Sequence, residues 1–310
     1  MHIITGSIAY DYIMDFPGKY EDHILPAQIH KINLSFLVNK FEKRRGGTAG
    51  NVSYSLGLLK TPHILFSYAG KDFKDYGQEL KKLKINIDHV SIDPTDYTST
   101  GFAMTDQNHN QIWGFFIGAS KSIPDLKLSE VAKKSDTILI GPSGVEGSMS
   151  FVNQCIQEGY SYIFDPGFIL TQVNDRDLEK GVKNCEILIG NDYEIELISK
   201  RIKNHEEIFK KIIVVKTLGK NGTEISEYGK RKIIKPVKVR SAIDPTGAGD
   251  AWRSGFIAGR EKKLSLKESA QMGSVAAAFA VEQYGTQEHT YTIEEFKTRY
   301  LATYGNPIEI

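Results

Sequence analysis

Short apolar runs alternate with amphipathic segments along most of the chain, and this alternation restricts the possible folds more than any other feature. The runs are bounded by glycine or proline, which is typical of buried strands, whereas the segments between them have helical spacing. Strands and helices that take turns indicate a parallel sheet covered by helices on both faces. The predicted strands are His63–Gly70, Thr137–Gly141, Tyr160–Gly167, Glu186–Asn191 and Ile212–Gly219, and the predicted helical segments include Phe73–Leu83, Met149–Gly159 and Asp192–Ile202.

Two regions interrupt this alternation. Residues 7–38 contain stretches of period two with no helix between them, and residues 98–118 predict two strands around the polar turn Gln107–Asn110. We therefore expect a small antiparallel sheet separate from the main one. It would either add a layer to the core or form a lid over a site, and the pattern leaves both open. We expect residues 1–310 to form a single α/β domain.

The charge balance argues against two classes of partner. Lys and Arg total 39 against 38 Asp and Glu, so no net field attracts nucleic acid or an anionic membrane. Two cysteines, each in an apolar stretch, make a disulfide framework implausible and predict a reducing, cytoplasmic compartment. The first residues lack the pattern of a signal peptide, and no apolar run is long enough to span a bilayer.

The stretch "SAIDPTGAGDAWRSGF" (Ser241–Phe256) is the strongest candidate for a functional turn. Gly247 and Gly249 permit a tight turn and leave the backbone amides open to a ligand, and the helix that follows adds unsatisfied N–H donors. Asp250 at the helix start is ordinarily a cap, and near a helix N-terminus it should stay ionised at neutral pH. An anion site beside a carboxylate also suits phosphoryl transfer: the amides would hold the γ-phosphate, and Asp250 would accept the proton of the attacking hydroxyl.

Other familiar motifs are missing from the sequence. No glycine–lysine pair is followed by Ser or Thr as a P-loop requires, and Trp252 occupies the place of the third glycine of a dinucleotide turn. There is no G-x-S-x-G and no His/Cys cluster with metal spacing. A phosphotransferase fits best, with a non-catalytic nucleotide-binding protein as the alternative from another class and a dehydrogenase as a distant one.

Four motifs carry a family resemblance. "DPTGAGDAW" (Asp244–Trp252) resembles the C-terminal signature of the ribokinase or PfkB superfamily of sugar and nucleoside kinases. "RRGGTAGNVSYSLGLL" (Arg44–Leu59), "GNDYE" (Gly190–Glu194) and "TLGKNG" (Thr217–Gly222) are similar to three further elements of that family, in the same order. The resemblance implies a ribokinase-like three-layer sandwich, with a mostly parallel central sheet and a small β-sheet lid.

The resemblance also narrows the reaction. Residues 5–38 and "YGTQEHTYT" (Tyr284–Thr292) are similar to bacterial adenosine kinases. This implies transfer of the γ-phosphate of ATP to the 5′-hydroxyl of adenosine, with Mg²⁺, in a homodimer formed through the lid. A ribokinase-like sugar kinase is the alternative within the family. Whether K⁺ binds near Asp244 and Thr246 stays open.

The resemblance assigns roles to the residues at the transferred phosphate and the ribose. Asp250 is the base, and the amides of Gly247, Ala248 and Gly249 form the anion hole. Asp11 would hold the sugar hydroxyls with its two carboxylate oxygens. The remaining ribose and base contacts implied are Gly47 through its backbone, Asn51 through its amide, and the hydroxyls of Ser7 and Ser35. Asn51 would otherwise cap a helix, and either serine would otherwise satisfy the lid backbone.

Aromatic side chains of the expected lid would bind the base. Phe36, Phe102 and Phe115 are the candidates for stacking on a purine. Phe102 stands one position away from its expected counterpart, and one position on a strand reverses the face. Asp165 falls where many sugar kinases have an Asp-x-Asn-x-Arg element, but "FDPGFIL" contains no arginine, which leaves the role of Asp165 open and weakens the case for a phosphosugar.

The nucleotide side of the site is expected after two later strands. Asn191 and Glu194 would organise Mg²⁺ through water, because this ion keeps much of its hydration shell. The same residues are also a good helix start. Thr217, Gly219 and Gly222 would line ATP, although the stretch is equally typical of an ordinary hairpin.

Overall fold

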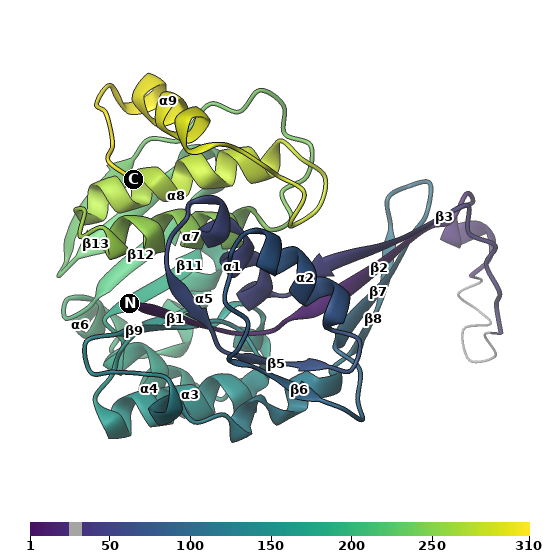
Figure 1. Cartoon of the computed structure of the whole chain (residues 1–310), viewed down its shortest axis with the longest axis horizontal. Coiled ribbons are helices and arrows are strands. Elements are labelled where there is room, and N and C mark those ends of the chain that lie inside the picture. Colours follow the sequence, from purple (N-terminus) through teal and green to yellow (C-terminus); the bar gives the residue numbers. More distant parts are fainter. Residues whose placement is uncertain (25–32) are drawn as a thin grey trace.

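An eight-stranded sheet forms the centre of the computed structural model, which describes residues 1–24 and 33–310 (Figure 1). The strand order is β14-β13-β12-β11-β10-β9-β1-β4; β12, β13 and β14 pair antiparallel and the other neighbours pair parallel. The strands are β1 (His2–Thr5), β4 (His63–Leu65), β9 (Thr137–Ile140), β10 (Ser161–Phe164), β11 (Ile187–Asn191), β12 (Ile213–Thr217), β13 (Thr223–Glu227) and β14 (Lys230–Ile234).

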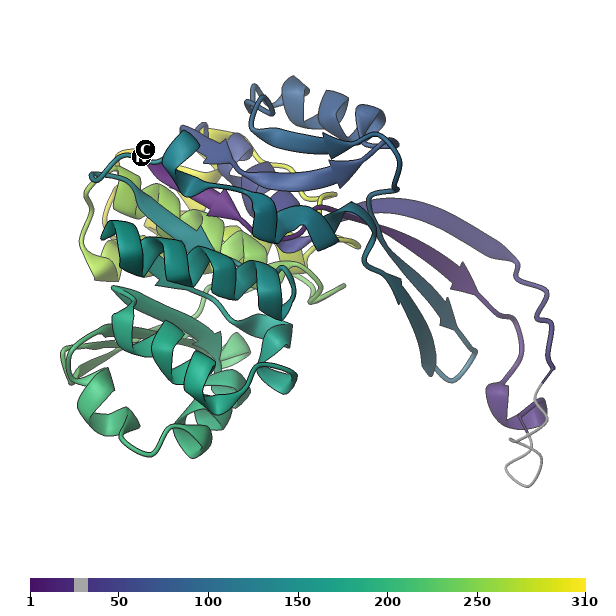
Figure 2. The same ribbon diagram turned by 90° about the horizontal axis from the view of Figure 1, so that it is seen from below.

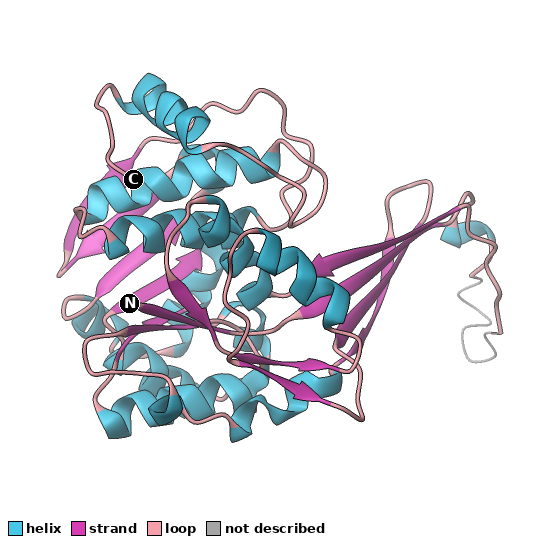
Figure 3. Ribbon diagram, viewed as in Figure 1, coloured by secondary structure: helices cyan, strands magenta, loops and turns pink. Residues whose placement is uncertain are grey.

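Helices cover both faces of this sheet, as the strand and helix alternation predicts (Figure 3). Successive side chains of a strand pack on opposite faces of the sheet. Ile4 of β1 and Leu139 of β9 lie in the core on one face, and Ile3 of β1 and Ile138 of β9 lie in the core on the other. The first side carries α1 (Thr48–Leu58), α2 (Lys74–Lys82), α7 (Ala248–Glu261), α8 (Leu266–Val281) and α9 (Ile293–Tyr304), and the second carries α3 (Gly144–Glu158), α4 (Asp175–Asn184), α5 (Asp192–Arg201) and α6 (His205–Phe209). Short 3-10 helices occur at Tyr20–Asp22, Gly118–Asp125, Leu128–Glu130, Gly167–Thr171 and Gly219–Asn221.

A second sheet extends from the body as the lid (Figure 2). Its order is β3-β2-β7-β8, from β2 (Ala9–Asp15), β3 (Lys40–Gly46), β7 (Ser99–Thr105) and β8 (Gln111–Phe116). The outer pairs are antiparallel as expected, but β2 and β7 pair parallel, so the sheet is mixed. The predicted range 7–38 misses β3, whose charged side chains on both faces hide the period-two pattern. Within the predicted range 7–38, β2 is the one strand among the described residues; residues 25–32 lie outside the described residues, and 33–38 form no strand.

The predicted strand His63–Gly70 is divided in two by Phe66. Its first half is β4 of the large sheet, and its second half is β5 (Ser67–Gly70), which pairs with β6 (Val90–Asp93) in a separate two-stranded sheet. The buried Ser67 hydroxyl donates to the carbonyl of Gly6 at 2.6 Å and fixes this change of sheet. An apolar run does not reveal such a change of direction.

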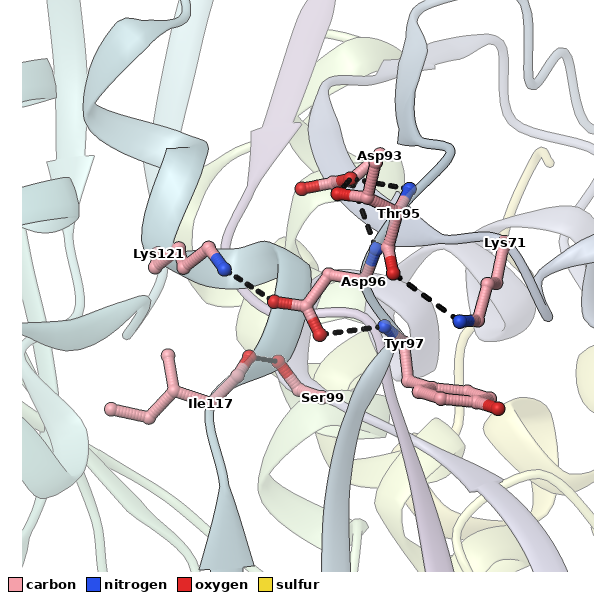
Figure 4. Close-up of polar contacts among 8 residues, drawn as sticks. All are labelled: Lys71, Asp93, Thr95, Asp96, Tyr97, Ser99, Ile117 and Lys121. Atoms are coloured by element: carbon pink, nitrogen blue, oxygen red, sulfur yellow. Dashed lines mark hydrogen bonds and ion pairs between the residues drawn. The ribbon is translucent and has the colours of Figure 1, made fainter.

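Polar contacts fix the lid hairpin to the body (Figure 4). The Ser99 hydroxyl at the start of β7 donates to the carbonyl of Ile117, just after β8, and so joins the two strands at their base. Lys121 forms an ion pair with Asp96 in the segment that enters β7. The base of the lid is therefore held on both strands.

Within residues 1–24 and 33–310, no helix combines the length and the apolar character needed to cross a membrane.

Candidate active site

The candidate residues gather at the carboxyl edge of the parallel strands. Asp165 follows β10 directly, and the register of β11 with β12 places Asn191 beside Thr217. Ligand sites of open α/β sheets are found at this edge. The helices α1 and α7 begin at the same edge, so residues from the whole length of the chain meet there.

The glycine-rich turn gives α7 an open start. Gly247 is the N-cap, with φ of 76°, and a Cβ there would lie 3.0 Å from the Cα of Thr286. The N–H groups of Gly247 and Gly249 make no hydrogen bond to the described residues, whereas Ala248 donates to the Pro245 carbonyl at 3.1 Å. Two of the three predicted anion-hole amides are therefore free in this structure, and the third is already engaged.

Asp250 lies in the first turn of α7 but does not cap it. Its carboxylate accepts no backbone N–H from residues 1–24 or 33–310; it accepts instead from the side-chain amide of Asn51 at 2.8 Å. The cap interpretation is therefore wrong for Asp250. Burial raises the pKa of this carboxyl to about 6, while Arg253 and the Asn51 hydrogen bond oppose the rise. The group is mostly ionised at neutral pH, as a proton acceptor requires.

Asn51 is oriented by a chain of hydrogen bonds. α1 is capped by Gly47, so Asn51 lies inside the helix and the cap interpretation is wrong here too. Its Oδ1 accepts from Nε2 of Gln287 at 2.9 Å, which leaves the Asn51 amide to donate toward α7. Gln287 also bonds the Tyr76 hydroxyl, which donates to the carbonyl of Gly46 at 2.8 Å. The chain of bonds thus connects the Asp250 carboxylate to the glycine turn before α1.

Asp165 has an arginine partner that comes from a different part of the chain. The Nη2 group of Arg253, one turn after Asp250, donates to Oδ1 of Asp165 at 2.6 Å, and its Nε faces Oδ2. The Asp165 side chain is 1% exposed, and the positive charge of Arg253 compensates the negative charge of this buried carboxylate. Asp165 thus has an arginine partner from α7, although "FDPGFIL" itself contains no arginine.

Asp11 on β2 lies in a cradle made by two glycines. A Cβ on Gly46 would stand 2.5 Å from one carboxylate oxygen, and one on Gly101 would stand 2.8 Å from the other. The carboxylate makes no hydrogen bond to the described part of the chain, and burial raises its pKa to about 6. The two Asp11 oxygens accept no hydrogen bond from the described residues, so they are available to the hydroxyl groups of a ligand.

Phe115 and Phe102 lie on opposite faces of the lid. Asp11, Gly101 and Phe115 are direct cross-strand neighbours and share one face. Trp113 shares it too and stacks on Phe115 at 5.4 Å between ring centroids. Phe102 points to the other face and stacks on Tyr12. The structure therefore brings Phe115, not Phe102, to the Asp11 face.

Gly47 and Ser7 serve the backbone around α1. Gly47 has φ of 86°, and a Cβ would lie 2.6 Å from the amide nitrogen of Ala9 and the carbonyl oxygen of Ser7. Only glycine fits there. The Ser7 hydroxyl accepts the N–H of Thr48 at 3.2 Å, so it supports the start of α1.

Phe36 and Ser35 lie at the outer end of the lid. Phe36 packs on Phe16 at 4.6 Å and on Tyr20, and Ser35 is exposed. Phe16 stands five positions beyond Asp11 along the lid, a spacing of roughly 16 Å in an extended strand. The structure does not bring these two residues to the Asp11 face.

The residues predicted to bind the nucleotide lie at the start of α5 and in the β12–β13 hairpin. Asn191 and Glu194 form a capping box at the start of α5, with bonds of 2.8 and 2.7 Å, so the helix-start interpretation is correct. Burial and nearby Asp165 raise the pKa of Glu194. Thr217, Gly219 and Gly222 form the β12–β13 hairpin, in which Gly222 has φ of 94°. Among the described residues no three His, Cys, Asp or Glu side chains group as metal ligands, so an ion here would need water and phosphate oxygens.

Four residues of the site are not found from sequence patterns: Tyr76, Trp113, Arg253 and Gln287. Arg253 offers one signal, because it stands three positions after Asp250 and so lies one helical turn away. Trp113 offers another, because it stands two positions before Phe115 on the same strand and so shares its face. Tyr76 and Gln287 lack any such spacing, since their partners are distant in sequence.

Comparisons with known proteins identify the family and the fold. The profile of the pfkB family carbohydrate kinase matches residues 6–293. A nucleoside kinase of Methanothermobacter thermautotrophicus is 31% identical over 98% of this chain and 96% of its own. The structure of Burkholderia thailandensis nucleoside kinase in complex with inosine superposes with a TM-score of 0.88 at 29% identity, covering 99% of this chain and all of that one. Its complex described as ADP-inosine gives a TM-score of 0.85 at 31% identity, covering 100% and 98%.

The fold and the site thus define a ribokinase-like α/β phosphotransferase. More particularly, the chain belongs to the pfkB family of carbohydrate kinases.

Proposed function

We propose that this protein transfers the γ-phosphoryl group of ATP to the 5′-hydroxyl of a nucleoside, with adenosine as the expected acceptor. The observation that carries the proposal is the position of Asp250: an ionised carboxylate, held by Asn51, beside free amides at the start of a helix. A base next to an anion site is the arrangement that phosphoryl transfer to an alcohol requires.

The chemistry follows from these groups. The 5′-oxygen attacks the γ-phosphorus, and the bond from that phosphorus to the β–γ bridging oxygen breaks. Asp250 takes the proton of the hydroxyl as the new bond forms, and the products are a nucleoside 5′-monophosphate and ADP. The amides of Gly247 and Gly249 stabilise the charge on the transferring group. A reaction that converts a nucleoside into its 5′-monophosphate is a nucleoside-salvage reaction.

Features of the lid support a nucleoside rather than a free sugar. Asp11 presents two acceptor oxygens to a vicinal diol, and Phe115 and Trp113 lie on the same face, where a base attached to that ribose would meet them. The inosine-bound relative from Burkholderia thailandensis agrees with a purine acceptor. A free sugar would leave the aromatic pair unused.

An ADP-release assay with adenosine, inosine, cytidine, ribose and fructose 6-phosphate tests the acceptor. We expect turnover with the nucleosides, highest with adenosine. Turnover of ribose with none of any nucleoside would establish the sugar-kinase alternative. If inosine or cytidine exceeds adenosine, the acceptor is a nucleoside but adenosine is the wrong choice.

The family implies ATP, typically with Mg²⁺. Asn191 and Glu194 are suited to hold the hydrated ion, because Asn191 pairs with Thr217 at the carboxyl edge of the sheet and Glu194 lies near Asp165 and Arg253. For K⁺, we expect backbone oxygens near Asp244 and Thr246, in the loop that Asp244 joins to Gly285 by a 3.0 Å hydrogen bond. Activity in K⁺ compared with choline chloride tests this ion.

We expect a homodimer joined through the lid. The face of the lid opposite Asp11 exposes Phe41, Phe102, Ile112 and Phe116, an apolar surface that a second copy would bury. Light scattering at working concentration tests this, and a monomer would contradict it. The free, buried Cys155 and Cys185 fit the expected reducing cytoplasm.

A further inference from the structure

Arg253 has a free side that the ion pair with Asp165 does not use. The Nε and Nη2 groups face the Asp165 carboxylate, and the guanidinium is planar with fixed donor directions. Nη1 therefore points elsewhere, and it forms no hydrogen bond with residues 1–24 or 33–310. The Arg253 side chain is only 11% exposed, so this free group is held in a nearly enclosed position.

The free Nη1 lies beside the anion hole. A Cβ built on Gly249 would stand 2.7 Å from Nη1, which is closer than any side chain permits. A side chain at position 249 would therefore either displace Nη1 or cover this face of the guanidinium. Nη1 and the free N–H of Gly249 are adjacent donors at one end of α7.

The charges around Arg253 favour an anionic ligand beside it. Asp165, Asp250 and Glu194 all lie near enough to raise the pKa of the guanidinium, so its charge is permanent. Asp165 faces it on one edge and leaves Nη1 for a ligand oxygen. A polyphosphate that enters between Glu194 and Asp250 passes two carboxylates, and a fixed cation between them offsets that repulsion.

We propose that Arg253 is a catalytic residue: its Nη1 donates to a non-bridging oxygen of the γ-phosphoryl group during transfer, with Asp165 as the residue that positions it. This rests on the proposed phosphotransferase function. Arg253 keeps its proton throughout, while the 5′-oxygen–phosphorus bond forms, the bond to the β–γ oxygen breaks and Asp250 receives the hydroxyl proton. The contribution of Arg253 is charge stabilisation that grows as the leaving oxygen departs.

Arg253→Ala tests the proposal through kcat and chemical rescue. We expect kcat to fall about 10²- to 10³-fold, as when a preorganised donor to the transition state is removed. We expect the KM for the nucleoside to change by less than about threefold, because the lost contact acts in the transition state. Guanidinium chloride at non-denaturing concentration should raise the kcat of the variant at least tenfold, since the free ion can occupy the vacated site. Arg253→Lys should stay impaired, because one ammonium cannot bind Asp165 and also reach the phosphate.

Arg299→Ala is the matched control. Arg299 on α9 is also largely buried, bonds both oxygens of Glu282 at 2.9 and 2.7 Å, and forms no hydrogen bond with α7 in the described part of the chain. It should lower the melting temperature and leave kcat within about twofold of wild type, with no guanidinium rescue.

Three results would overturn the proposal: near-normal kcat in Arg253→Ala, a comparable loss of kcat in Arg299→Ala, or a folded Arg253→Ala protein that guanidinium does not rescue. If Arg253→Ala does not fold, the uncharged Arg253→Gln replaces it with the same expectations. If wild type phosphorylates sugars and no nucleoside, the acceptor proposal fails, but the kcat loss and rescue still decide the role of Arg253.

Discussion

The two oxygens of the Asp250 carboxylate have different surroundings. Oδ2 accepts the Asn51 amide, and Oδ1 forms no hydrogen bond with the described residues. Under the proposed mechanism, the free oxygen is the one that receives the proton. This division of tasks within one carboxylate depends on the direction of the Asn51 amide, which Gln287 sets.

Asp250→Asn removes the proton acceptor and preserves the shape of the site. We expect kcat to fall by roughly 10²- to 10⁴-fold, the usual contribution of a general base, while ATP still binds. Steady-state ADP release and calorimetric ATP titration measure the two quantities. Asp125→Asn, at an exposed position, is the control and should be fully active. A near-normal rate in Asp250→Asn would remove Asp250 from the mechanism.

Gln287→Glu should shift the acid limb of kcat against pH. In wild type we expect kcat to decline as pH falls through about 6, the pKa to which burial raises Asp250. A carboxylate at 287 cannot donate, so the Asn51 amide must turn and its hydrogen bond to Asp250 is lost. That bond lowers the pKa, so its loss moves the limb to higher pH. Gln271→Glu, at a buried glutamine bonded to Tyr300, is the control. An unmoved limb in Gln287→Glu would contradict this role.

Sequence patterns identify the residues whose chemistry lies in a local motif. Gly247, Gly249 and Asp250 share one turn, so a single stretch of sequence predicts that they lie together. Arg253 and Gln287 act through contacts with Asp165 and Asn51, 88 and 236 positions away. One sequence contains no information on which distant side chains meet, so these roles require the structure.

At the scale of the elements, burial decides which strands a sequence pattern reveals. The central strands are buried on both faces and appear as apolar runs, and so β9 to β12 were predictable. β3 is half exposed and carries charge on both faces, so its pattern is lost. The change from β4 to β5 is a bend within an apolar run, which hydrophobicity does not record.

The two faces of the lid predict different effects for two phenylalanines. Phe115→Ala should raise the KM for the nucleoside by roughly 5- to 100-fold, the equivalent of a lost base stack, and leave the KM for ATP unchanged. Phe102→Ala, on the face opposite Asp11, should change the nucleoside KM much less. Initial rates over a range of each substrate compare the two variants. An equal or larger effect in Phe102→Ala would mean that the bound nucleoside lies against the other face.

At the scale of the whole molecule, the site costs stability. The folded-state pKa of Asp11 is about 6 against an ordinary value of 3.8, because burial disfavours its ionised form. The folded protein therefore binds the proton more tightly than the unfolded chain between these values. Stability contributed by this group falls as pH rises from 3.8 to about 6, and the cost is complete above that range.

Asp11→Asn should therefore stabilise the fold and weaken substrate binding. We expect the free energy of unfolding at pH 7.5 to rise by roughly 1–3 kcal/mol, with the gain vanishing near pH 4, where the wild-type group is protonated in the folded state. The KM for the nucleoside should rise. Thermal unfolding at the two pH values and initial rates provide the measurements, with Asp125→Asn as the control. A stability change of equal size at both pH values would show that ionisation is not its cause.

The hydrogen-bond chain from Asp250 through Asn51 to Gln287 also makes the site a product of the whole fold. Asn51 and Asp250 are 199 positions apart in sequence, and Asn51 and Gln287 are 236 positions apart. Contacts between such distant positions form only when the segments that carry them pack together. The Asp250 carboxylate is therefore oriented only in the folded molecule, and a local opening of any one of these three segments would release it from Asn51.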